Sequence, residues 1–337
     1  MAGSGTAHLR DGALVSVENL VVEFPAGRGR TVNAVTNISF DIVEGETLGL
    51  VGESGCGKST TGRAIIQLPP PTSGKVRFDG IELTSLHGEA LRERRPQMQM
   101  IFQDPISSLN PRRTVFDIVA EPLRVWKIGT PSEQDARVRE VLDAVGVDPD
   151  MAKVRRPHEY SGGQCQRISI ARAVVTNPKV IICDEPVSAL DVSVQAQILN
   201  LLEDMKVRYG LTLVFIAHDL AVVKNISDRV AVLYLGKMCE IAEPDRLYAE
   251  PAHPYTRALI ASIPMPDPEA SQENLFRLSG ELPSPLDPPS GCRFRTRCPI
   301  AQPICESVEP QLKEVGPEHY VACHFDLVSQ PVELVSR

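Results

Sequence analysis

The sequence lacks any apolar run of the roughly 18 to 20 residues that a helix needs to cross a bilayer. Its longest apolar runs, residues 211–217 and 230–235, have the length of buried strands. The sequence also lacks an excess of positive charge, because the formal net charge is -8. A protein that coats nucleic acid through a general basic field is therefore not indicated.

The first dozen residues lack both the basic leader and the apolar core of a secretory signal. We therefore expect residues 1–12 to form a flexible tail of a protein that is not secreted. The chain nevertheless contains eight cysteines. In a chain that is not secreted, cysteines are more typical of free thiols or metal ligands than of disulfides.

The chain has 337 residues, of which 42% are apolar and 23% are charged, a balance typical of a globular protein with a sizeable core. This length favours one large domain with an appendage, or two domains. Of the 28 prolines, 13 fall in residues 1–243 and 15 fall from Pro244 onward. Because proline lacks a backbone donor and fixes φ, we place a boundary near residue 245 and expect residues 246–337 to be loop-rich.

Before that boundary, two kinds of segment alternate. Strand-like apolar runs occupy residues 14–24, 47–51, 180–183 and 211–217, and amphipathic stretches typical of helices occupy residues 132–145 and 192–208. Strand, helix and strand at this spacing predict an α/β fold with a mostly parallel sheet and helices on both faces.

A glycine-rich segment lies between the strand at residues 47–51 and a helical pattern. It reads Gly52, Glu53, Ser54, Gly55, Cys56, Gly57, Lys58 and Ser59, with Thr60 next. This fits the phosphate-loop motif GxxxxGK[ST], in which backbone N–H groups cradle phosphates at a helix N-terminus. The motif predicts that Lys58 binds the β and γ phosphates of a nucleotide and that Ser59 holds Mg²⁺. Cys56 lies near that helix N-terminus and beside Lys58, so we expect a reactive thiolate that ATP protects, with a small packing residue as the alternative.

Two carboxylates follow the apolar strand at residues 180–183. Asp184 and Glu185 come where ligands bind at the carboxyl edge of a parallel sheet. We expect Asp184 to hold Mg²⁺ through water and Glu185 to orient and polarise the attacking water.

Between these motifs, residues 160–164 read YSGGQ at the start of another helical pattern. With the phosphate loop, Gln103, the acidic pair, SALD at residues 188–191 and His218, this segment completes an ordered set over residues 52–218. The set resembles an ATP-binding cassette nucleotide-binding domain. The resemblance implies a P-loop NTPase fold over residues 13–245, with a parallel core sheet, an antiparallel edge sheet and a helical subdomain at about residues 104–175.

The resemblance also implies roles for individual residues. Gln103 would sense Mg²⁺ and couple to transmembrane subunits, His218 would contact the γ-phosphate, and Asp191 would serve communication in a dimer. Ser161, Gly162, Gly163 and Gln164 would bind the γ-phosphate of the ATP on a partner ATPase. Phe24 is the aromatic residue that we place under adenine, although a core or edge-strand phenylalanine fits nearly as well. Cys165 stands where this family commonly has arginine or lysine, which removes a cation near the helix start.

The C-terminal part indicates one branch of the family. Residues 251–257 (PAHPYTR), the segment LSGELPSPLDPPSGC and residues 107–112 (SSLNPR) resemble the ATPase subunits of bacterial dipeptide and oligopeptide importers. This resemblance implies ATP hydrolysis that powers peptide import, at the cytoplasmic face of the bacterial membrane. The implied partners are a second, homologous ATPase subunit, two permease subunits and an extracytoplasmic substrate-binding protein. Dipeptides, oligopeptides, nickel chelates and glutathione stay open as substrates, because selectivity lies in other subunits.

Two alternative functions stay open at this point. The chain could serve a metabolic enzyme complex, as do related ATPases of phosphonate degradation, or its C-terminal module could be a redox sensor that regulates the ATPase.

Four cysteines crowd near the end of the chain. Cys292, Cys298, Cys305 and Cys323 are spaced C-x5-C-x6-C-x17-C, without the close pair that zinc knuckles usually contain. Four thiolates suit either a [4Fe-4S] cluster or zinc, and free thiols are a third interpretation. Arg293, Arg295 and Arg297 would offset the negative charge of either group, and His319 and His324 are less favoured ligands. The resemblance to peptide importers favours the cluster, which we expect to be structural.

Overall fold

A computed structural model describes residues 8–27, 29–263 and 280–329. By the density of its internal contacts the chain divides into two compact units. The first unit comprises Met1–Val43, Thr47–Ser85 and Ala217–Arg337, and the second comprises Glu44–Glu46 and Leu86–Ile216. The phosphate-loop motif and the C-terminal extension, residues 246–337, thus belong to one unit.

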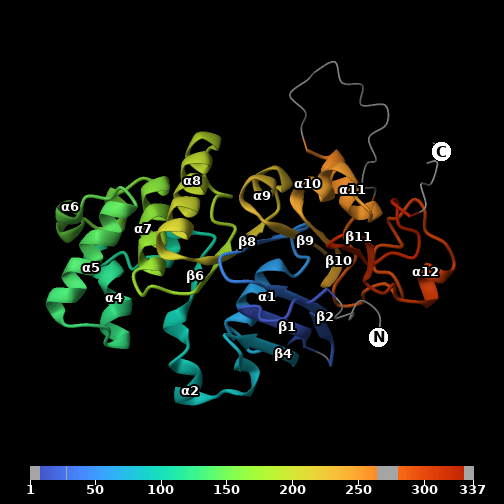
Figure 1. Cartoon of the computed structure of the whole chain (residues 1–337), viewed down its shortest axis with the longest axis horizontal. Coiled ribbons are helices and arrows are strands. Elements are labelled where there is room, and N and C mark those ends of the chain that lie inside the picture. The colour runs from blue at the N-terminus through green and yellow to red at the C-terminus, as the bar shows by residue number, and fades with distance from the viewer. Residues whose placement is uncertain (1–7, 28, 264–279, 330–337) are drawn as a thin grey trace. The chain divides into compact units, whose positions relative to one another are not determined.

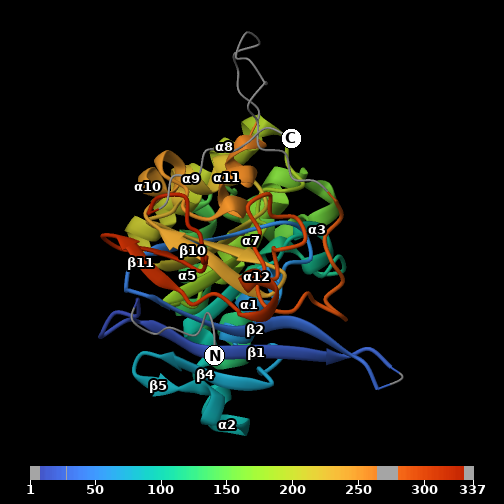
Figure 2. The ribbon, with the colours of Figure 1, turned by 90° about the vertical axis from the view of Figure 1, so that its right-hand side faces the viewer.

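An antiparallel sheet of the first unit has the strand order β2-β1-β4-β5, and Figure 2 shows β1, β2 and β4 side by side. Its strands are β1 (Val15–Pro25), β2 (Thr31–Ile42), β4 (Ser73–Phe78) and β5 (Ile81–Glu82). Val15, Val17, Leu20 and Val22 of β1 are fully buried. The apolar side chains of the run at residues 14–24 therefore form a core face, as a strand that is half exposed requires.

Five strands of the first unit form part of a mixed sheet, in the order β11-β12-β10-β9-β3. They are β3 (Thr47–Val51), β9 (Arg229–Tyr234), β10 (Lys237–Ala242), β11 (Lys313–Gly316) and β12 (His319–Val321). β3 pairs in parallel with β9, whereas the other neighbours are antiparallel. β3 and β9 are buried along their whole length, which explains their continuous apolar sequences.

The helices of the first unit are short. They are α1 (Lys58–Ile65), α9 (Leu220–Ile226), α10 (Pro244–Ala249), α11 (Pro254–Ala261) and α12 (Ile304–Ser307). Proline occupies the first helical position of α10 and of α11, where no backbone donor is needed. Most described residues of the C-terminal extension lie outside helices and strands, as its proline content predicts, and Pro254 stands where α11 begins. The expected loop at residues 263–270 lies almost entirely outside the described residues.

The second unit contains three parallel strands in the order β8-β7-β6. They are β6 (Met98–Ile101), β7 (Val180–Asp184) and β8 (Thr212–Ala217). Its helices are α2 (Gly88–Arg92), α3 (Pro105–Ser108), α4 (Val115–Trp126), α5 (Pro131–Ala144), α6 (Pro149–Val154), α7 (Gly162–Val174) and α8 (Val192–Tyr209). Helix α4 contacts α5, α6 and α7, and Figure 1 shows these four helices gathered together. Helices α3 to α7 fall within the range expected for a helical subdomain.

Local signals set the ends of the second unit's long helices. Thr130 caps α5 through a reciprocal pair of hydrogen bonds with Glu133, and Pro131 takes the first helical position. Asp191 caps α8, which ends where Gly210 adopts the left-handed conformation with φ of 62°. Both helices begin and end within one residue of the predicted bounds. Parallel strands connected through helices confirm the α/β fold class.

Two residues of the expected N-terminal tail bind β2. The His8 ring is buried and its Nε2 lies 2.7 Å from the Ser39 carbonyl oxygen. The Arg10 Nε donates to the Asp41 carboxylate at 2.7 Å. Among the described residues, no helix combines the length and the apolar character that crossing a membrane requires.

Candidate functional site

The phosphate-loop motif forms a tight turn between β3 and α1 in the first unit. Gly52 and Gly57 have φ of 149° and 100°, conformations that residues with a side chain rarely adopt. A Cβ on Gly52 would lie 2.1 Å from the Leu233 carbonyl oxygen, and one on Gly57 would lie 2.3 Å from that of Ala34. Only glycine fits at both positions, because the loop backbone passes directly over neighbouring strands.

Lys58 is buried at the start of α1. Its Nζ donates to the carbonyl oxygens of Gly52 at 2.8 Å and Glu53 at 3.0 Å. The Thr61 amide donates to the Gly57 carbonyl at 2.8 Å, which continues the loop directly into the helix. The ammonium group thus lies inside the loop whose backbone leads into a helix N-terminus, an arrangement suited to binding an anion.

Cys56 does not form the reactive thiolate that its position in the sequence predicts. Its side chain is fully buried, and burial raises the pKa of the thiol despite the neighbouring Lys58 ammonium. The expectation considered only the helix N-terminus and the cation, whereas loss of hydration of the charged form is the larger effect. Cys56 is therefore a small packing residue below the loop.

Phe24, the residue expected under adenine, lies near the end of β1 opposite Val32 of β2. Its side chain is 37% exposed, which is unusual for an aromatic residue of this sheet. This exposure contradicts a phenylalanine of the core but does not test the other alternative, an edge-strand phenylalanine. An exposed aromatic ring offers a stacking surface to a planar ligand.

In the second unit, the acidic pair stands where β7 ends. Asp184 is buried, whereas Glu185 is half-buried and adopts a left-handed conformation with φ of 48°. The Glu185 amide donates to the Ile216 carbonyl at 3.0 Å, which fixes this unusual backbone. The Gln103 side-chain amide donates to the Glu185 carboxylate at 3.0 Å. The structure thus brings together two of the predicted catalytic residues, 82 positions apart.

The SGGQ segment begins α7. Ser161 is the N-cap, its Oγ accepts from the Gln164 amide, and the Gln164 side chain accepts from the Ser161 amide. A Cβ on Gly163 would lie 2.6 Å from a methyl group of Val194 on α8, whereas one on Gly162 would lie 3.8 Å from Leu190. The close approach of α7 and α8 therefore requires glycine at position 163 but not at position 162.

Cys165 follows this segment and is buried. Its thiol donates to the Pro157 carbonyl at 3.4 Å, and burial raises the pKa of the thiol. The residue that replaces the family's cation is thus a neutral packing residue.

Asp191 and His218 are both exposed. The Asp191 carboxylate accepts from the Ser193 hydroxyl at 2.6 Å and from the Val194 amide at 3.0 Å, and these bonds lower the pKa of Asp191. His218 directly follows β8 along the chain and itself belongs to the first unit. Each side chain stands at the end of a regular element, where a ligand can reach it.

The four late cysteines line one pocket of the C-terminal extension. Cys292, Cys298, Cys305 and Cys323 share it with apolar side chains that include Phe294 and Ile300. Burial raises the pKa of the Cys298 and Cys323 thiols to about 12. Within the described residues, no group of three or more His, Cys, Asp or Glu side chains is arranged to hold a metal ion. The predicted metal site therefore finds no support in the arrangement of its ligands.

The charged residues expected to assist these cysteines have other partners. Arg293 donates to the Leu235 carbonyl and to the Thr36 hydroxyl, and Arg295 donates to the Ser290 carbonyl at 3.0 Å. The His319 ring lies 2.6 Å from the buried Glu240 carboxylate, and His324 lies 2.9 Å from the Val308 carbonyl. These contacts hold the extension together and bind it to β2, to β10 and to the turn between β9 and β10.

Sequence analysis missed a connection between the phosphate loop and the extension. Arg297 forms an ion pair with Glu53 at 2.6 Å, and the Glu53 amide donates to the Tyr255 hydroxyl at 2.8 Å. The only signal for this pair was an acid inside the loop motif and a basic residue next to a late cysteine. Neither pattern identifies a partner 244 residues away.

Comparison with known proteins agrees with these motifs. Residues 35–188 match the ABC transporter family, and residues 239–305 match the C-terminal region of oligopeptide and dipeptide transporters. The chain is 52% identical to the oligopeptide transport ATP-binding protein AppF of Bacillus subtilis, covering 87% of this chain and 90% of that protein. It is 51% identical to the oligopeptide transport ATP-binding protein OppF of Salmonella typhimurium, covering 92% and 95%.

Solved structures of cassette ATPases are also similar. A dimeric post-hydrolysis structure of the ATP-binding cassette MJ0796, bound to ADP and Pi, superposes with a TM-score of 0.62 at 31% identity. The match covers 68% of this chain and 98% of that one.

Proposed function

The chain belongs to the family of ABC transporter ATPases that serve oligopeptide transport, and on that premise we propose that its ATP hydrolysis powers the import of peptides through transmembrane subunits. The observation that carries this proposal is the combination of both matches on one chain, the cassette and the peptide-transporter C-terminal region. The comparisons give no support to service in a metabolic enzyme complex or to a redox-regulated ATPase.

Residues of the first unit bind the nucleotide in this proposal. The glycine backbone from Gly52 to Gly57 binds the phosphates, and the Lys58 ammonium, which already lies inside the loop, supplies positive charge to the β and γ phosphates. Phe24 stacks on adenine and His218 contacts the γ-phosphate. Phosphoryl transfer needs little covalent chemistry from the protein. These residues therefore act by positioning the nucleotide and by stabilising the charge on its phosphates.

Residues of the second unit act on the attacking water. Glu185 orients and polarises it, and Gln103 orients Glu185 through the amide that it donates at 3.0 Å. The Ser59 hydroxyl of the first unit and the buried Asp184 carboxylate of the second are each an oxygen donor of the kind that Mg²⁺ prefers. When bound, this ion neutralises charge that develops on the phosphates.

A dimer of ATPases completes the proposed function. Ser161, Gly162, Gly163 and Gln164 bind the ATP of a partner ATPase, and Asp191 serves communication between the two. The capped N-terminus of α7, an electropositive helix end, supports this assignment. The proposed partners are a second ATPase subunit, two permeases that hold the chain at the membrane surface and an extracytoplasmic substrate-binding protein.

A test of peptide import uses the chain co-expressed with candidate permeases, a candidate substrate-binding protein and a tagged copy of itself. Membrane vesicles that contain the purified complex should accumulate a labelled oligopeptide only with ATP, and Glu185→Gln in the same complex is the matched control. A complex that retains permeases but moves no di- or oligopeptide would contradict peptide import while leaving the ATPase assignment intact.

We further propose that Cys292, Cys298, Cys305 and Cys323 bind a [4Fe-4S] cluster. No three of these thiols are arranged around a single metal ion, but all four line one pocket and come from separate short segments. In a cubane each thiolate binds a different iron, so the four sulfurs need not converge on one ion as they must at a zinc site. Bound there, the cluster would cross-link the extension, and its formation requires these thiols to lose their protons.

The cluster has a direct chemical test. Protein purified without oxygen should contain about four irons and four sulfides per chain. Replacing any one of the four cysteines by serine should remove them, whereas Cys183→Ala, a control in β7, should not. Stoichiometric zinc without iron would contradict the cluster.

A further inference from the structure

An ion pair joins the C-terminal extension to the phosphate loop. The Arg297 guanidinium donates to both carboxylate oxygens of Glu53, through Nη1 at 2.6 Å and Nη2 at 3.1 Å. The Arg297 side chain is 5% exposed and that of Glu53 is 28% exposed. A bidentate ion pair of this kind fixes the relative orientation of the two side chains as well as pairing their charges, and burial protects it from screening by salt.

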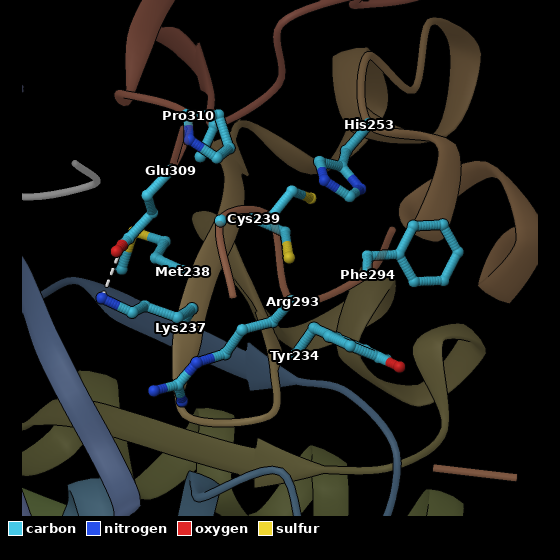
Figure 3. Close-up of a pocket in the computed structure, with 12 residues that line it drawn as sticks. Tyr234, Lys237, Met238, Cys239, His253, Arg293, Phe294, Glu309 and Pro310 are labelled. Carbon is cyan, nitrogen blue, oxygen red and sulfur yellow. Dashed lines mark ion pairs between the residues drawn. The ribbon is translucent and has the colours of Figure 1, made fainter. Parts of the chain in front are cut away.

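Tyr234 of β9, together with aromatic residues of the extension, also holds Arg297 in place. Its Nη1 lies 3.4 Å from the Tyr234 hydroxyl, and its guanidinium lies over the Tyr234 ring at 5.8 Å from the centroid. Tyr234 in turn packs edge-on against Phe294 and Tyr255, at centroid distances of 5.2 and 4.8 Å. Figure 3 shows Tyr234, Arg293 and Phe294 around a pocket that is lined by residues of β9, β10 and the extension. Arg297 therefore projects from a packed aromatic cluster.

Glu53 is held by the extension at two points. Its side chain binds Arg297, and its backbone amide donates to the Tyr255 hydroxyl at 2.8 Å. Its carbonyl accepts from Lys58 at 3.0 Å, so the same residue contacts the loop's cation. The position of Glu53 is thus decided jointly by the loop and by residues more than 200 positions later in the chain.

The carboxylate of Glu53 would oppose the function of the loop if it were not neutralised. A negative charge within a loop that binds phosphates repels them, because like charges a few ångströms apart interact strongly where water is partly excluded. Arg297 supplies the compensating positive charge from outside the motif.

We propose that Arg297 is a positioning residue of the ATPase, which neutralises Glu53 and fixes the phosphate loop, so that the C-terminal extension sets the affinity for ATP. The effect acts on nucleotide binding, whereas the catalytic groups of the second unit are unchanged. Arg297→Met therefore raises the KM for ATP and leaves kcat at saturating ATP within about twofold.

The experiment measures the Kd of the full chain for a fluorescent ATP analogue with Mg²⁺, together with KM and kcat. Arg297→Met should weaken binding about tenfold, which corresponds to about 1.4 kcal/mol. Glu53→Gln should tighten it about threefold, and the double variant should return to within about twofold of the unmodified chain, since neither charge is then present. Arg295→Met removes the same charge from the same segment, but Arg295 bonds to Ser290, so it should bind ATP normally.

Two results would overturn the proposal. Unchanged affinity in Arg297→Met would show that the pair does not act on the loop. A double variant as weak as Arg297→Met would show that Arg297 acts through the stability of the extension and not through Glu53. If Arg297→Met fails to fold, the ATP affinity of Glu53→Gln alone tests the proposal. Weaker ATP binding in that variant would show that the Glu53 carboxylate does not repel the phosphates.

Discussion

The side-chain amide of Gln103 donates to the Glu185 carboxylate at 3.0 Å. Gln103 lies two residues beyond the end of β6, and Glu185 lies one residue beyond the end of β7, its parallel neighbour. Parallel strands place their carboxyl ends at one edge of a sheet, so the hydrogen bond is a direct consequence of the pairing. It gives the proposed catalytic carboxylate one fixed orientation.

Replacing Glu185 by Gln should nearly abolish turnover while ATP still binds. The amide keeps the shape of the side chain but cannot accept a proton, and general bases contribute about 100- to 10,000-fold. Steady-state ATPase assays and trapping of labelled ATP measure the two effects separately. In a complex whose partner sites are disabled, turnover near that of the unmodified protein would exclude Glu185 as the base.

Cys56 should react slowly with maleimide in the folded protein, at equal rates with and without Mg-ATP. Burial raises the pKa of its thiol and hides the sulfur. Ser54→Cys is the matched control, because Ser54 is exposed in the same loop and its thiol should react quickly. Mass spectrometry of labelled peptides distinguishes the two sites. Rapid labelling of Cys56 that ATP blocks would restore the expectation of a reactive thiolate.

Gly163→Ala should lower the free energy of unfolding by about 1–3 kcal/mol, the usual cost of overpacking. The added methyl group would meet Val194 at 2.6 Å, and α7 and α8 would have to separate. Gly162→Ala, whose methyl group has 3.8 Å of clearance, should unfold at nearly the same denaturant concentration as the unmodified protein. The pair Gly163→Ala with Val194→Ala should recover part of the loss; without recovery, the clash is not the cause.

Glu240→Ala should destabilise the protein by about 3–5 kcal/mol, as removal of one partner from a buried polar network does. The fully buried Glu240 carboxylate accepts from the Ala252 and His253 amides, both at 2.8 Å, and pairs with His319. Thermal unfolding measures the effect, and Glu243→Ala is the control, because Glu243 is exposed and its side chain makes no capping bond. Equal melting temperatures for the two variants would show that this network does not hold the extension.

The sequence by itself determined the elements that carry the motifs. Residues 47–51 form β3 as predicted, because a strand that is buried on both faces has a continuous apolar sequence. Helix α8 begins at Val192 because the residue before it, Asp191, is a capping residue. The family and its fold followed from the order of such local motifs.

Tertiary structure alone decided the burial of Cys56, which raises the pKa of its thiol, the contact of His319 with Glu240 and the pairing of Arg297 with Glu53. Each depends on groups that the chain brings together from distant positions, 244 residues apart in the case of Arg297 and Glu53. Desolvation and ion pairing depend on the groups that surround a side chain in space. Those groups come together only when the chain folds, so a linear pattern of residue types does not reveal them.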